Sequence, residues 1–553
     1  MTDLSFNKSV LRIDIKDNVM VALQNLKMGD VITRYGKEVI LQNDINAKHK
    51  FFTDEVYPGD DVIMYGVLVG TANQYIPVGG LMTTENVKHA ANPYSYKSAK
   101  YEWTPPDISK YTGKTFNGYK RADGRVGTAN YWLFIPTVFC ENRNLDVIKE
   151  ALHNELGYAV TDKYKQYTHH LAECLKRGDD LGSLPNTLFA SGTQKVTRVF
   201  KNIDGIKFLN HQGGCGGTRQ DAAVLSKLLA SYADHPNVAG ITVLSLGCQH
   251  LQVQDFVNDL KKRTPEFDKP LYIFEQQESE SEEQLITGAI RKTFDGLIEV
   301  NKVERTPVPL SELCIGVKCG GSDGFSGISA NPAIGYTSDL LVALGGKVLL
   351  AEFPELCGAE QGLIDRCVDE GIANKFIKLM SDYDAMAHQD GSGFHMNPSP
   401  GNIKDGLITD AMKSAGAAKK GGTAPVSDVL NYTEPAIKPG LSLVCTPGND
   451  VEATTGKAAS GATLILFTTG LGTPTGNAVA PTIKIATNSA LAKRMGDIID
   501  IDTGSIITAE KTIEEMGEEI LEYCIKVASG EIIPKAVLLN QDDFIPWKRG
   551  VSL

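Results

Sequence analysis

The chain has 553 residues, with 55 Lys plus Arg against 67 Asp plus Glu and a net charge of −12. This length exceeds what a single hydrophobic core covers and predicts roughly three domains. An acidic chain without a basic run is poorly suited to bind nucleic acid or an anionic membrane. A small anionic substrate remains open, because a few local cations decide such binding.

No charged segment followed by an apolar stretch occurs at the N-terminus, and no run of about 18 apolar residues occurs anywhere. We therefore expect a cytoplasmic protein without a signal peptide. Ten cysteines are too few for a disulfide scaffold, and a reducing compartment would keep them as thiols. Five of them lie inside apolar or helical patterns and are predicted to be core residues: Cys174, Cys314, Cys367, Cys445 and Cys524.

The first part of the chain reads as a small β module. Residues 1–90 contain short apolar runs separated by Gly-Asp, Asn-Asp and Pro-Gly turns, which is typical of short strands. Residues 91–118 are rich in Tyr, Lys, Pro and Ser with little periodicity, and are predicted to form a linker. A mostly β appendage followed by a crossing segment is therefore expected.

Two α/β domains with mainly parallel sheets are predicted beyond the linker, over residues 119–305 and 306–553. In the first, strand-like runs alternate with helical patterns, such as the apolar stripe at positions 145, 148, 151, 152 and 156. In the second, strand-like runs at 347–353, 441–445 and 462–467 end in Gly, Pro or Thr-rich loops. A polar passage at 390–425 is too long for an ordinary connection, and is interpreted as a functional loop or a disordered segment.

Four strand-like runs end at a cysteine: Cys140, Cys215, Cys248 and Cys319. The carboxyl ends of parallel strands meet at one edge of a sheet, where α/β proteins bind ligands. Several thiols in one crevice would suit a soft or borderline metal such as iron. Because Cys319 lies beyond the boundary near residue 306, the crevice is predicted to lie between two domains.

Two glycine-rich segments carry chemistry-bearing side chains. The first, residues 211–218, places His211 and Cys215 directly before a predicted helix, where backbone N–H groups favour an anion or a thiolate. The second, residues 319–327, combines Cys319, Ser322 and Asp323 with four glycines and suits a polyol or carboxylate ligand. Ordinary tight turns are the alternative for both segments.

These and other motifs together resemble the altronate and galactarate dehydratase family, a group of sugar-acid hydro-lyases that includes the related sulfolactate sulfo-lyases. The resemblance covers essentially the full length and identifies the first module as similar to a SAF (β-clip) domain. The motifs that carry it begin at Asp17, His49, Asp123, Gly213, Tyr232, Leu246, Cys319, Asn397, Lys420, Phe467 and Pro481, with Thr487-Asn488 closing the series.

The resemblance implies that water is removed from a hexonate or hexarate to give a 2-keto-3-deoxy acid, with a divalent metal described as iron or manganese. The proton next to a carboxylate is barely acidic. A metal on the carboxylate and α-hydroxyl would stabilise the enediolate, while a base takes that proton and an acid protonates the departing hydroxyl.

Residue chemistry suggests roles within this reaction. Metal ligands are predicted at Cys215, Cys248 and Cys319, with Glu360 and Cys140 as further candidates; Fe²⁺ is favoured, with Mn²⁺ and an iron–sulfur cluster as alternatives. His49, which two lysines flank, His211 and Lys484 are the predicted catalytic residues; a surface basic turn is the alternative at His49. Substrate contacts are predicted for Lys50, Arg125, Ser322, Asp323, Thr468, Thr469 and Asn488.

Three departures from the family pattern limit which sugar acid is expected to be the substrate. Thr84, Ala129 and Leu471 stand where relatives commonly carry His or Arg, so cationic groups are missing. Because an aldarate has two carboxylates to bind, an altronate-like aldonate is favoured over galactarate. A sulfolactate-type lyase and a sugar-acid-binding paralogue without turnover are the alternatives, and a homodimer is expected.

Overall fold

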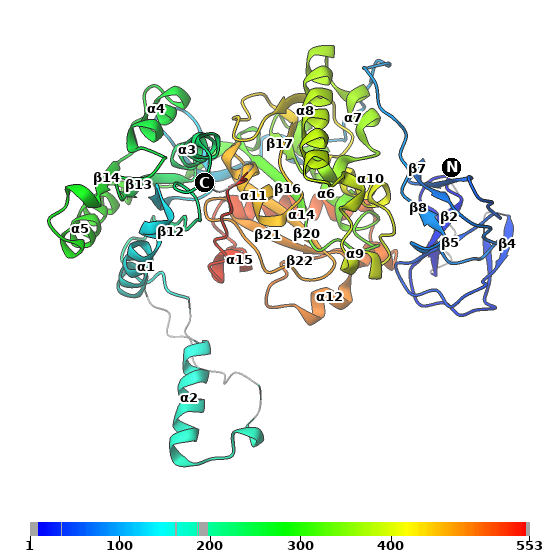
Figure 1. Cartoon of the computed structure of the whole chain (residues 1–553), viewed down its shortest axis with the longest axis horizontal. Helices are drawn as coiled ribbons and strands as arrows, with labels where there is room; N and C mark the ends of the chain where they lie inside the picture. Colours follow the sequence, from blue (N-terminus) through cyan, green and yellow to red (C-terminus); the bar gives the residue numbers. More distant parts are fainter. Residues whose placement is uncertain (1–8, 35, 161–162, 185, 187–196, 549–553) are drawn as a thin grey trace.

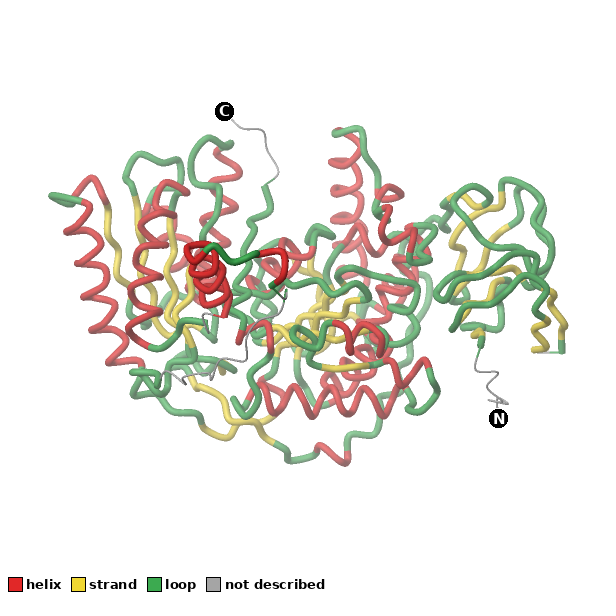
Figure 2. The backbone as a smooth tube through the Cα atoms, turned by 90° about the horizontal axis from the view of Figure 1, so that it is seen from below, coloured by secondary structure: helices red, strands yellow, loops and turns green. Residues whose placement is uncertain are grey.

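The computed structural model describes residues 9–34, 36–160, 163–184, 186 and 197–548. Figure 1 shows the C-terminal domain in the centre, with the N-terminal β module on one side and the middle domain on the other. The same order is visible from below in Figure 2. The predicted fold class, a β module followed by two α/β domains with parallel sheets, is confirmed.

The N-terminal module consists of short antiparallel strands, as the turn-rich sequence predicts. Its hydrophobic core continues into the C-terminal domain, because Val19, Phe52 and Tyr65 pack with Met412 and Ala415. The module is therefore anchored to the C-terminal domain by shared apolar contacts. Its strands are β1 (Val10–Leu11), β2 (Val19–Ala22), β3 (Val31–Arg34), β4 (Lys37–Ile40), β5 (Lys50–Phe52), β6 (Asp61–Met64), β7 (Val67–Ala72) and β8 (Val87–Lys88).

The predicted linker runs along the C-terminal domain. The Ser95 N–H donates to the side chain of Gln361, and the indole of Trp103 donates to Thr423. After the short turn η1 (Ser109–Tyr111), strand β9 (Thr115–Lys120) pairs with β10 (Val126–Gly127) and with β15 (Thr306–Pro309). The strands that lead into and out of the middle domain are thus joined in one antiparallel ribbon.

The middle domain holds a four-stranded parallel sheet in the order β12-β11-β13-β14. The apolar runs that form it are buried throughout β11 and β13, which is why they read as continuous rather than alternating. Its strands are β11 (Tyr131–Pro136), β12 (Gly205–Phe208), β13 (Val238–Ser245) and β14 (Leu271–Glu275), and its helices are α1 (Asn142–Leu156), α2 (Lys163–Arg177), α3 (Arg219–Asp234), α4 (Val253–Arg263) and α5 (Glu282–Val300), with turns η2 (Phe139–Glu141), η3 (Leu181–Ser183) and η4 (Gln276–Glu278).

The C-terminal domain holds a seven-stranded parallel sheet in the order β18-β19-β17-β16-β20-β21-β22. On one side of the sheet, α14 packs on α6. The strands are β16 (Cys314–Cys319), β17 (Lys347–Leu350), β18 (Val426–Leu430), β19 (Gly440–Val444), β20 (Leu464–Thr469), β21 (Thr482–Ala486) and β22 (Ile501–Asp502). The helices are α6 (Ala330–Ala343), α7 (Glu360–Arg366), α8 (Glu370–Gln389), α9 (Pro400–Lys404), α10 (Asp410–Ala418), α11 (Asp450–Ala459), α12 (Ser489–Arg494), α13 (Gly504–Ile507), α14 (Ile513–Ala528) and α15 (Lys535–Leu538), with turns η5 (Leu310–Glu312), η6 (Phe353–Leu356), η7 (Phe394–Met396) and η8 (Lys419–Gly421).

The polar passage at 390–425 is not an unstructured loop. It forms η7, α9, α10 and η8, and side-chain caps hold its helix starts: Ser399 caps α9 and Thr409 caps α10. The prediction of a loop or a disordered segment rested on the high content of glycine and polar residues. Several short helices with polar caps have the same composition as a loop, so composition did not distinguish the two. The five cysteines predicted to be core residues are all buried.

The chain's last described residues clamp the two α/β domains together. The Lys207 ammonium of β12 lies 2.6 Å from the Asp542 carboxylate, and both side chains are buried. On the same boundary, the Asn237 side-chain amide donates to the carbonyl oxygens of Thr463 and Val479. Within the described residues, none of the helices has both the length and the apolarity needed to span a bilayer.

Replacing Asp542 by alanine leaves the Lys207 ammonium buried without its carboxylate. We expect a loss of about 3–5 kcal/mol in the free energy of unfolding, measured by urea titration. Asp44→Ala is the matched control, because the Lys27–Asp44 pair has a similar distance of 2.8 Å but is exposed; this variant should unfold like the wild type. Equal losses in the two variants would contradict the assignment of a clamp.

Candidate active site

The carboxyl edge of the seven-stranded sheet gathers most of the predicted site residues. β16, β17, β20 and β21 are parallel neighbours, so the loops that follow them open on the same edge. Open α/β sheets bind ligands at this edge. The segment 319–327, here named the Cys319 loop, follows β16.

The thiol of Cys319 is buried among polar groups. Its Sγ lies 2.8 Å from the Ser322 hydroxyl and 3.6 Å from the Asn331 side-chain amide of α6. The Thr468 hydroxyl in turn donates to the Asn331 oxygen at 2.8 Å. Three residues predicted to be ligands or substrate contacts, Cys319, Ser322 and Thr468, are therefore connected through Asn331, which the sequence motif contained without a role.

Asp323 is the most enclosed group of the Cys319 loop. One carboxylate oxygen accepts from the Thr487 hydroxyl at 3.1 Å and lies 3.0 Å from the Lys48 ammonium; the other accepts from the Ser326 hydroxyl at 3.0 Å. A Cβ at Gly470 would lie 2.2 Å from the Asp323 Cγ. The site therefore requires glycine at 470, and the Gly470-containing motif is explained by close packing.

The N-terminal module contributes three consecutive residues to this site. Besides Lys48, the Lys50 ammonium donates to the Gly406 carbonyl at 2.7 Å, and the His49 Nε2 donates to the Lys404 carbonyl at 3.1 Å. Burial lowers the pKa of Lys50 to about 7; Asp323 opposes this shift and Lys48 adds to it. Burial also lowers the pKa of His49. Residues 404–406 thus fix the basic segment against the Cys319 loop.

Lys484 lies in the middle of β21, opposite Phe467 of β20, and Asn488 follows the carboxyl end of that strand. The Lys484 ammonium is 3.6 Å from the centre of the Phe467 ring, and burial lowers the pKa of this lysine to about 7 against the opposing charge of Asp450. Asn488 caps α12 through the Leu491 N–H. The Thr469 hydroxyl accepts from backbone N–H groups of residues 471–473 and so shapes the loop after β20.

A buried group of charges beneath this edge was missed by sequence reasoning. The Glu352 carboxylate contacts the ammonium groups of Lys318, Lys420 and Lys457, all of them fully buried. Glu352 also has a left-handed backbone with φ 74°. Burial alone would raise the pKa of Glu352, but the three lysines lower it. The signal in the sequence was a lysine at the end of the otherwise apolar run before Cys319.

The other three strand-end cysteines lie at adjacent strand ends of the middle domain. Cys140, Cys215 and Cys248 follow β11, β12 and β13, which are adjacent and parallel, and all three thiols are exposed. Cys319 follows a strand of the other sheet, in the C-terminal domain, which agrees with its position beyond the boundary near residue 306.

Gly213 and Gly214 connect the three cysteine loops through backbone hydrogen bonds. The His250 N–H donates to the Gly214 carbonyl at 2.9 Å, and the Phe139 N–H donates to the Gly213 carbonyl at 3.1 Å. Gly214 has φ +93°, and a Cβ there would lie 2.1 Å from the Thr137 carbonyl oxygen. Only glycine fits this crossing point, for both backbone and steric reasons.

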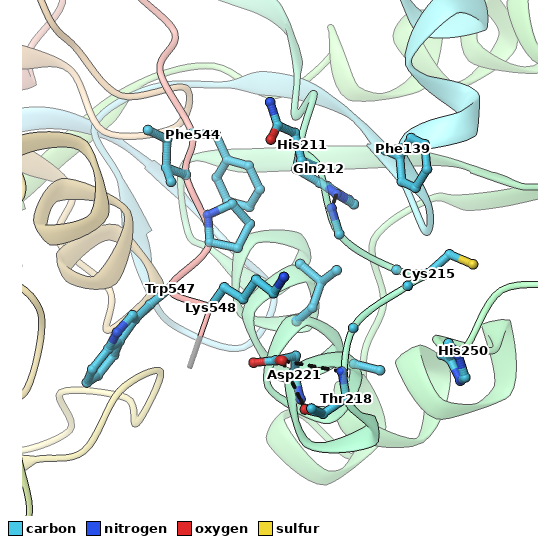
Figure 3. A pocket seen from close by; sticks show the side chains of 18 of the residues that line it. Phe139, His211, Gln212, Cys215, Thr218, Asp221, His250, Phe544, Trp547 and Lys548 are labelled. Carbon is cyan, nitrogen blue, oxygen red and sulfur yellow. Dashed lines mark hydrogen bonds between the residues drawn. The ribbon is translucent and has the colours of Figure 1, made fainter. Parts of the chain in front are cut away.

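A cleft of about 680 Å³ lies beside these loops, between the middle domain and the end of the chain. Figure 3 shows Lys548 and Trp547 on one side and the glycine-rich loop with Cys215 on the other. The Cys215 sulfur points toward the side of Phe139 and His250, away from Trp547. Asp221 is engaged by the Thr218 hydroxyl at 2.9 Å, within the predicted capping box.

His211 lines this cleft but does not have the geometry of a base. Its Nε2 donates to the Pro136 carbonyl at 2.8 Å, and its Nδ1 accepts from the Gly213 N–H at 3.0 Å. Burial lowers its pKa to about 4. Because both ring nitrogens are engaged by backbone, the catalytic role predicted for His211 is corrected to a positioning role for the glycine-rich loop.

Two further predicted residues, Arg125 and Glu360, lie elsewhere. Arg125 is bound by the carboxylates of Asp123 and Asp234. Glu360, on α7, accepts from the Gly358 N–H, and burial raises its pKa to about 7. Over the residues that the structure describes, no three His, Cys, Asp or Glu side chains are placed to hold a metal ion. The predicted ligand set of Cys140, Cys215, Cys248, Cys319 and Glu360 is not assembled in this conformation.

The three departures from the family pattern fall at different places. Leu471 lies at the Cys319 loop, because a Cβ at Gly321 would be 3.3 Å from the Leu471 Cβ. Ala129 is buried in the middle domain, and its carbonyl accepts from Arg121. Thr84 is exposed near the end of the N-terminal module. Of these three positions, 471 is the one that borders the candidate active site.

Comparison with known proteins covers nearly the whole chain. Three family profiles match in order: the altronate/galactarate dehydratase SAF domain at residues 8–90, the second domain of D-galactarate dehydratase/altronate hydrolase at 118–301, and the C-terminal domain of D-galactarate/altronate dehydratase at 310–552.

Relatives match along their full length as well. An altronate dehydratase of Bacillus subtilis (strain 168) is 32% identical over 99% of this chain and 100% of its own. An altronate dehydratase of Escherichia coli (strain K12) is 33% identical over 98% and 99%. A galactarate dehydratase (L-threo-forming) of the same strain is 30% identical over 94% and 93%. With its three domains in the family's order, the chain belongs to the altronate/galactarate dehydratase family of hydro-lyases, and its N-terminal module is the SAF domain of that family.

Proposed function

We propose that this enzyme removes water from an altronate-like aldonate to give a 2-keto-3-deoxy acid. Full-length similarity to two altronate dehydratases supports the reaction class. The structural observations that carry the proposal are two buried lysines: Lys50 of the SAF domain, held by the Gly406 carbonyl beside the Cys319 loop, and Lys484 of β21, whose ammonium lies over the Phe467 ring. Lys50 and Lys484 both have pKa values lowered to about 7.

Amines with such pKa values suit the first step of the reaction. Near neutral pH a sizeable part of each amine is unprotonated and able to accept the proton next to the substrate carboxylate. The β-hydroxyl then leaves as water after accepting a proton from a second group, and the enol that remains ketonises. We assign Lys484 as the base, with Lys50 and His49 as the candidates for the acid.

The charges at the site favour one carboxylate over two. The Lys48 ammonium is already engaged by Asp323 and by Asp405 at 3.3 Å. Leu471 borders the Cys319 loop, and its apolar side chain is 38% exposed. A cationic side chain at this position could bind a second carboxylate, and leucine cannot. A galactarate-type substrate is the second candidate, because the galactarate dehydratase relative matches over nearly the whole chain.

A divalent metal, Fe²⁺ or else Mn²⁺, is also part of the proposal. It would supply Lewis-acid stabilisation of the enediolate. The exposed thiols of Cys140, Cys215 and Cys248 fit the donor chemistry of a soft or borderline metal, or of an iron–sulfur cluster. Cys319 and Glu360 are the further candidate ligands, separate from this group of thiols.

The proposed function is tested by incubating anaerobically purified, iron-loaded protein with aldonates and aldarates, and measuring 2-keto-3-deoxy acid. We expect altronate to give the highest kcat/KM and galactarate a value at least about tenfold lower. A higher kcat/KM for galactarate than for altronate would show that the substrate is an aldarate and not an aldonate. Absence of product from every acid, with metal bound, would refute the dehydratase proposal.

Lys484→Gln is expected to lower kcat by at least about a hundredfold, because the base is removed. In the wild type the unprotonated amine is the active form, so the rising limb of the kcat/KM profile should have a midpoint of about 7, and kcat/KM should fall at higher pH as the group that acts as the acid loses its proton. Lys484→Arg should fail equally, since arginine stays protonated. Lys493→Gln, on the exposed face of α12, is the matched control and should keep the wild-type profile. An unchanged pH profile in Lys484→Gln would exclude this lysine as the base.

A further inference from the structure

A cavity of about 520 Å³ lies where the SAF domain, the linker and the C-terminal domain meet. Tyr65 lines it from the SAF domain, Tyr101 from the linker, and Tyr336 and Arg366 from helices α6 and α7. Among the described residues that line this space, here named the Arg366 cavity, none has a role in the proposed reaction. Cavities of this size commonly hold small organic molecules. The chain therefore has a second ligand-sized space, separate from the candidate active site.

The guanidinium of Arg366 is a cation without a carboxylate partner. Its Nε and Nη2 donate to the Ala424 carbonyl at 3.1 and 2.6 Å, and Nη2 lies 3.4 Å from the Gly421 carbonyl oxygen. Within the part of the chain that the structure describes, this guanidinium forms no ion pair, and its Nη1 has no hydrogen-bond partner. Two carbonyl groups thus fix the orientation of the guanidinium and leave its charge to be neutralised by another group.

Asp339 also lines the Arg366 cavity, but its carboxylate is engaged by the backbone. It accepts from the N–H groups of Thr423 and Ala424, each at 2.8 Å, and from the Thr423 hydroxyl at 2.8 Å. These bonds stabilise a turn in which Gly422 has φ +59° and a Cβ would lie 2.4 Å from the Asp339 Oδ1. Asp339 therefore shapes the wall of the cavity and leaves the Arg366 guanidinium available to a ligand.

Lys419 supplies a second cation to the Arg366 cavity. This lysine is exposed, and among the described residues its ammonium has neither a hydrogen-bond partner nor an ion-pair partner. The charged side chains that line the cavity are Arg366, Lys419 and Asp339, so two cations exceed one carboxylate by one charge. The chain as a whole carries −12. A local positive charge of this kind attracts an anionic ligand even on an acidic protein.

Three tyrosines give the Arg366 cavity apolar walls of fixed shape: Tyr65, Tyr101 and Tyr336. The Tyr101 hydroxyl donates to the Thr423 carbonyl at 2.7 Å. Tyr65 lies so close to Gly327 that a Cβ at this glycine would be 2.2 Å from the tyrosine hydroxyl oxygen. Aromatic side chains pack well against flat apolar groups. The cavity therefore suits a ligand with a ring or another flat apolar body beside its anionic group.

We propose that the Arg366 cavity binds a small organic anion, whose carboxylate or phosphate pairs with Arg366 and Lys419 while its flat apolar body lies among the three tyrosines. The N–H groups of a guanidinium match either anion. Because the ligand touches the SAF domain, the linker and the C-terminal domain at once, its binding stabilises their assembly. The site is separate from the candidate active site, and the inference does not depend on the proposed reaction.

Isothermal titration calorimetry of the full-length chain tests this inference with two probes: 4-hydroxybenzoate for a carboxylate and phenyl phosphate for a phosphate. We expect at least one to bind with a Kd below about 1 mM, and the tighter probe identifies the anionic group. Phenol, which lacks the charge, and inorganic phosphate, which lacks the ring, should each bind at least about tenfold more weakly. Saturating altronate should not displace the probe, because the two sites are separate.

Variants of the two cations locate the binding site. Lys419→Gln removes a charge that has no partner within the described residues, and should raise the Kd of the tighter probe at least about fivefold. Arg366→Gln should raise it at least about tenfold. Lys261→Gln, at an exposed position of α4, is the matched control and should keep the wild-type Kd. Binding of neither anion, displacement of the probe by altronate, or a Kd unchanged in both cation variants would overturn the inference.

Discussion

The buried carboxylate of Asp323 is the constraint on which the site depends. A carboxylate removed from water has to be matched by a cation and hydrogen-bond donors, because an unpaired buried charge is strongly destabilising. Here Lys48 supplies the cation from one domain, while Thr487 and Ser326 supply donors from another. The pairing therefore fixes the SAF domain on the C-terminal sheet, and brings Lys50 and His49 with it.

Much of the architecture could be predicted because its signals are local. Continuous apolar runs followed by glycine and a helical stripe indicated parallel sheets, and the sheets are parallel. The same reasoning placed Cys140, Cys215 and Cys248 at adjacent strand ends. It also placed the strand before Cys319 in the C-terminal domain, but it could not give the order of the strands in either sheet, because strand pairing between distant segments leaves no mark in either segment.

Side-chain roles were harder to predict than positions. His211 occurred in the right motif, but its two ring nitrogens bind backbone, and a sequence does not show hydrogen-bond partners. The cluster around Glu352 was missed for a related reason: its three lysines come from a strand, a short turn and a helix that are far apart in the chain. Only the folded sheet shows that they share one carboxylate.

The ribbon of β9, β10 and β15 determines how the middle domain is connected to the rest of the chain. Because the chain enters and leaves that domain through paired strands, the entire domain has the connectivity of an insertion with a single stem. The domain is nevertheless held against the C-terminal domain, because the two share one hydrophobic core and Asn237 donates to the carbonyl oxygens of Thr463 and Val479. The orientation of the thiol-bearing loops relative to the lysines is therefore set by the paired strands at the stem, by this shared core and by the Lys207–Asp542 ion pair.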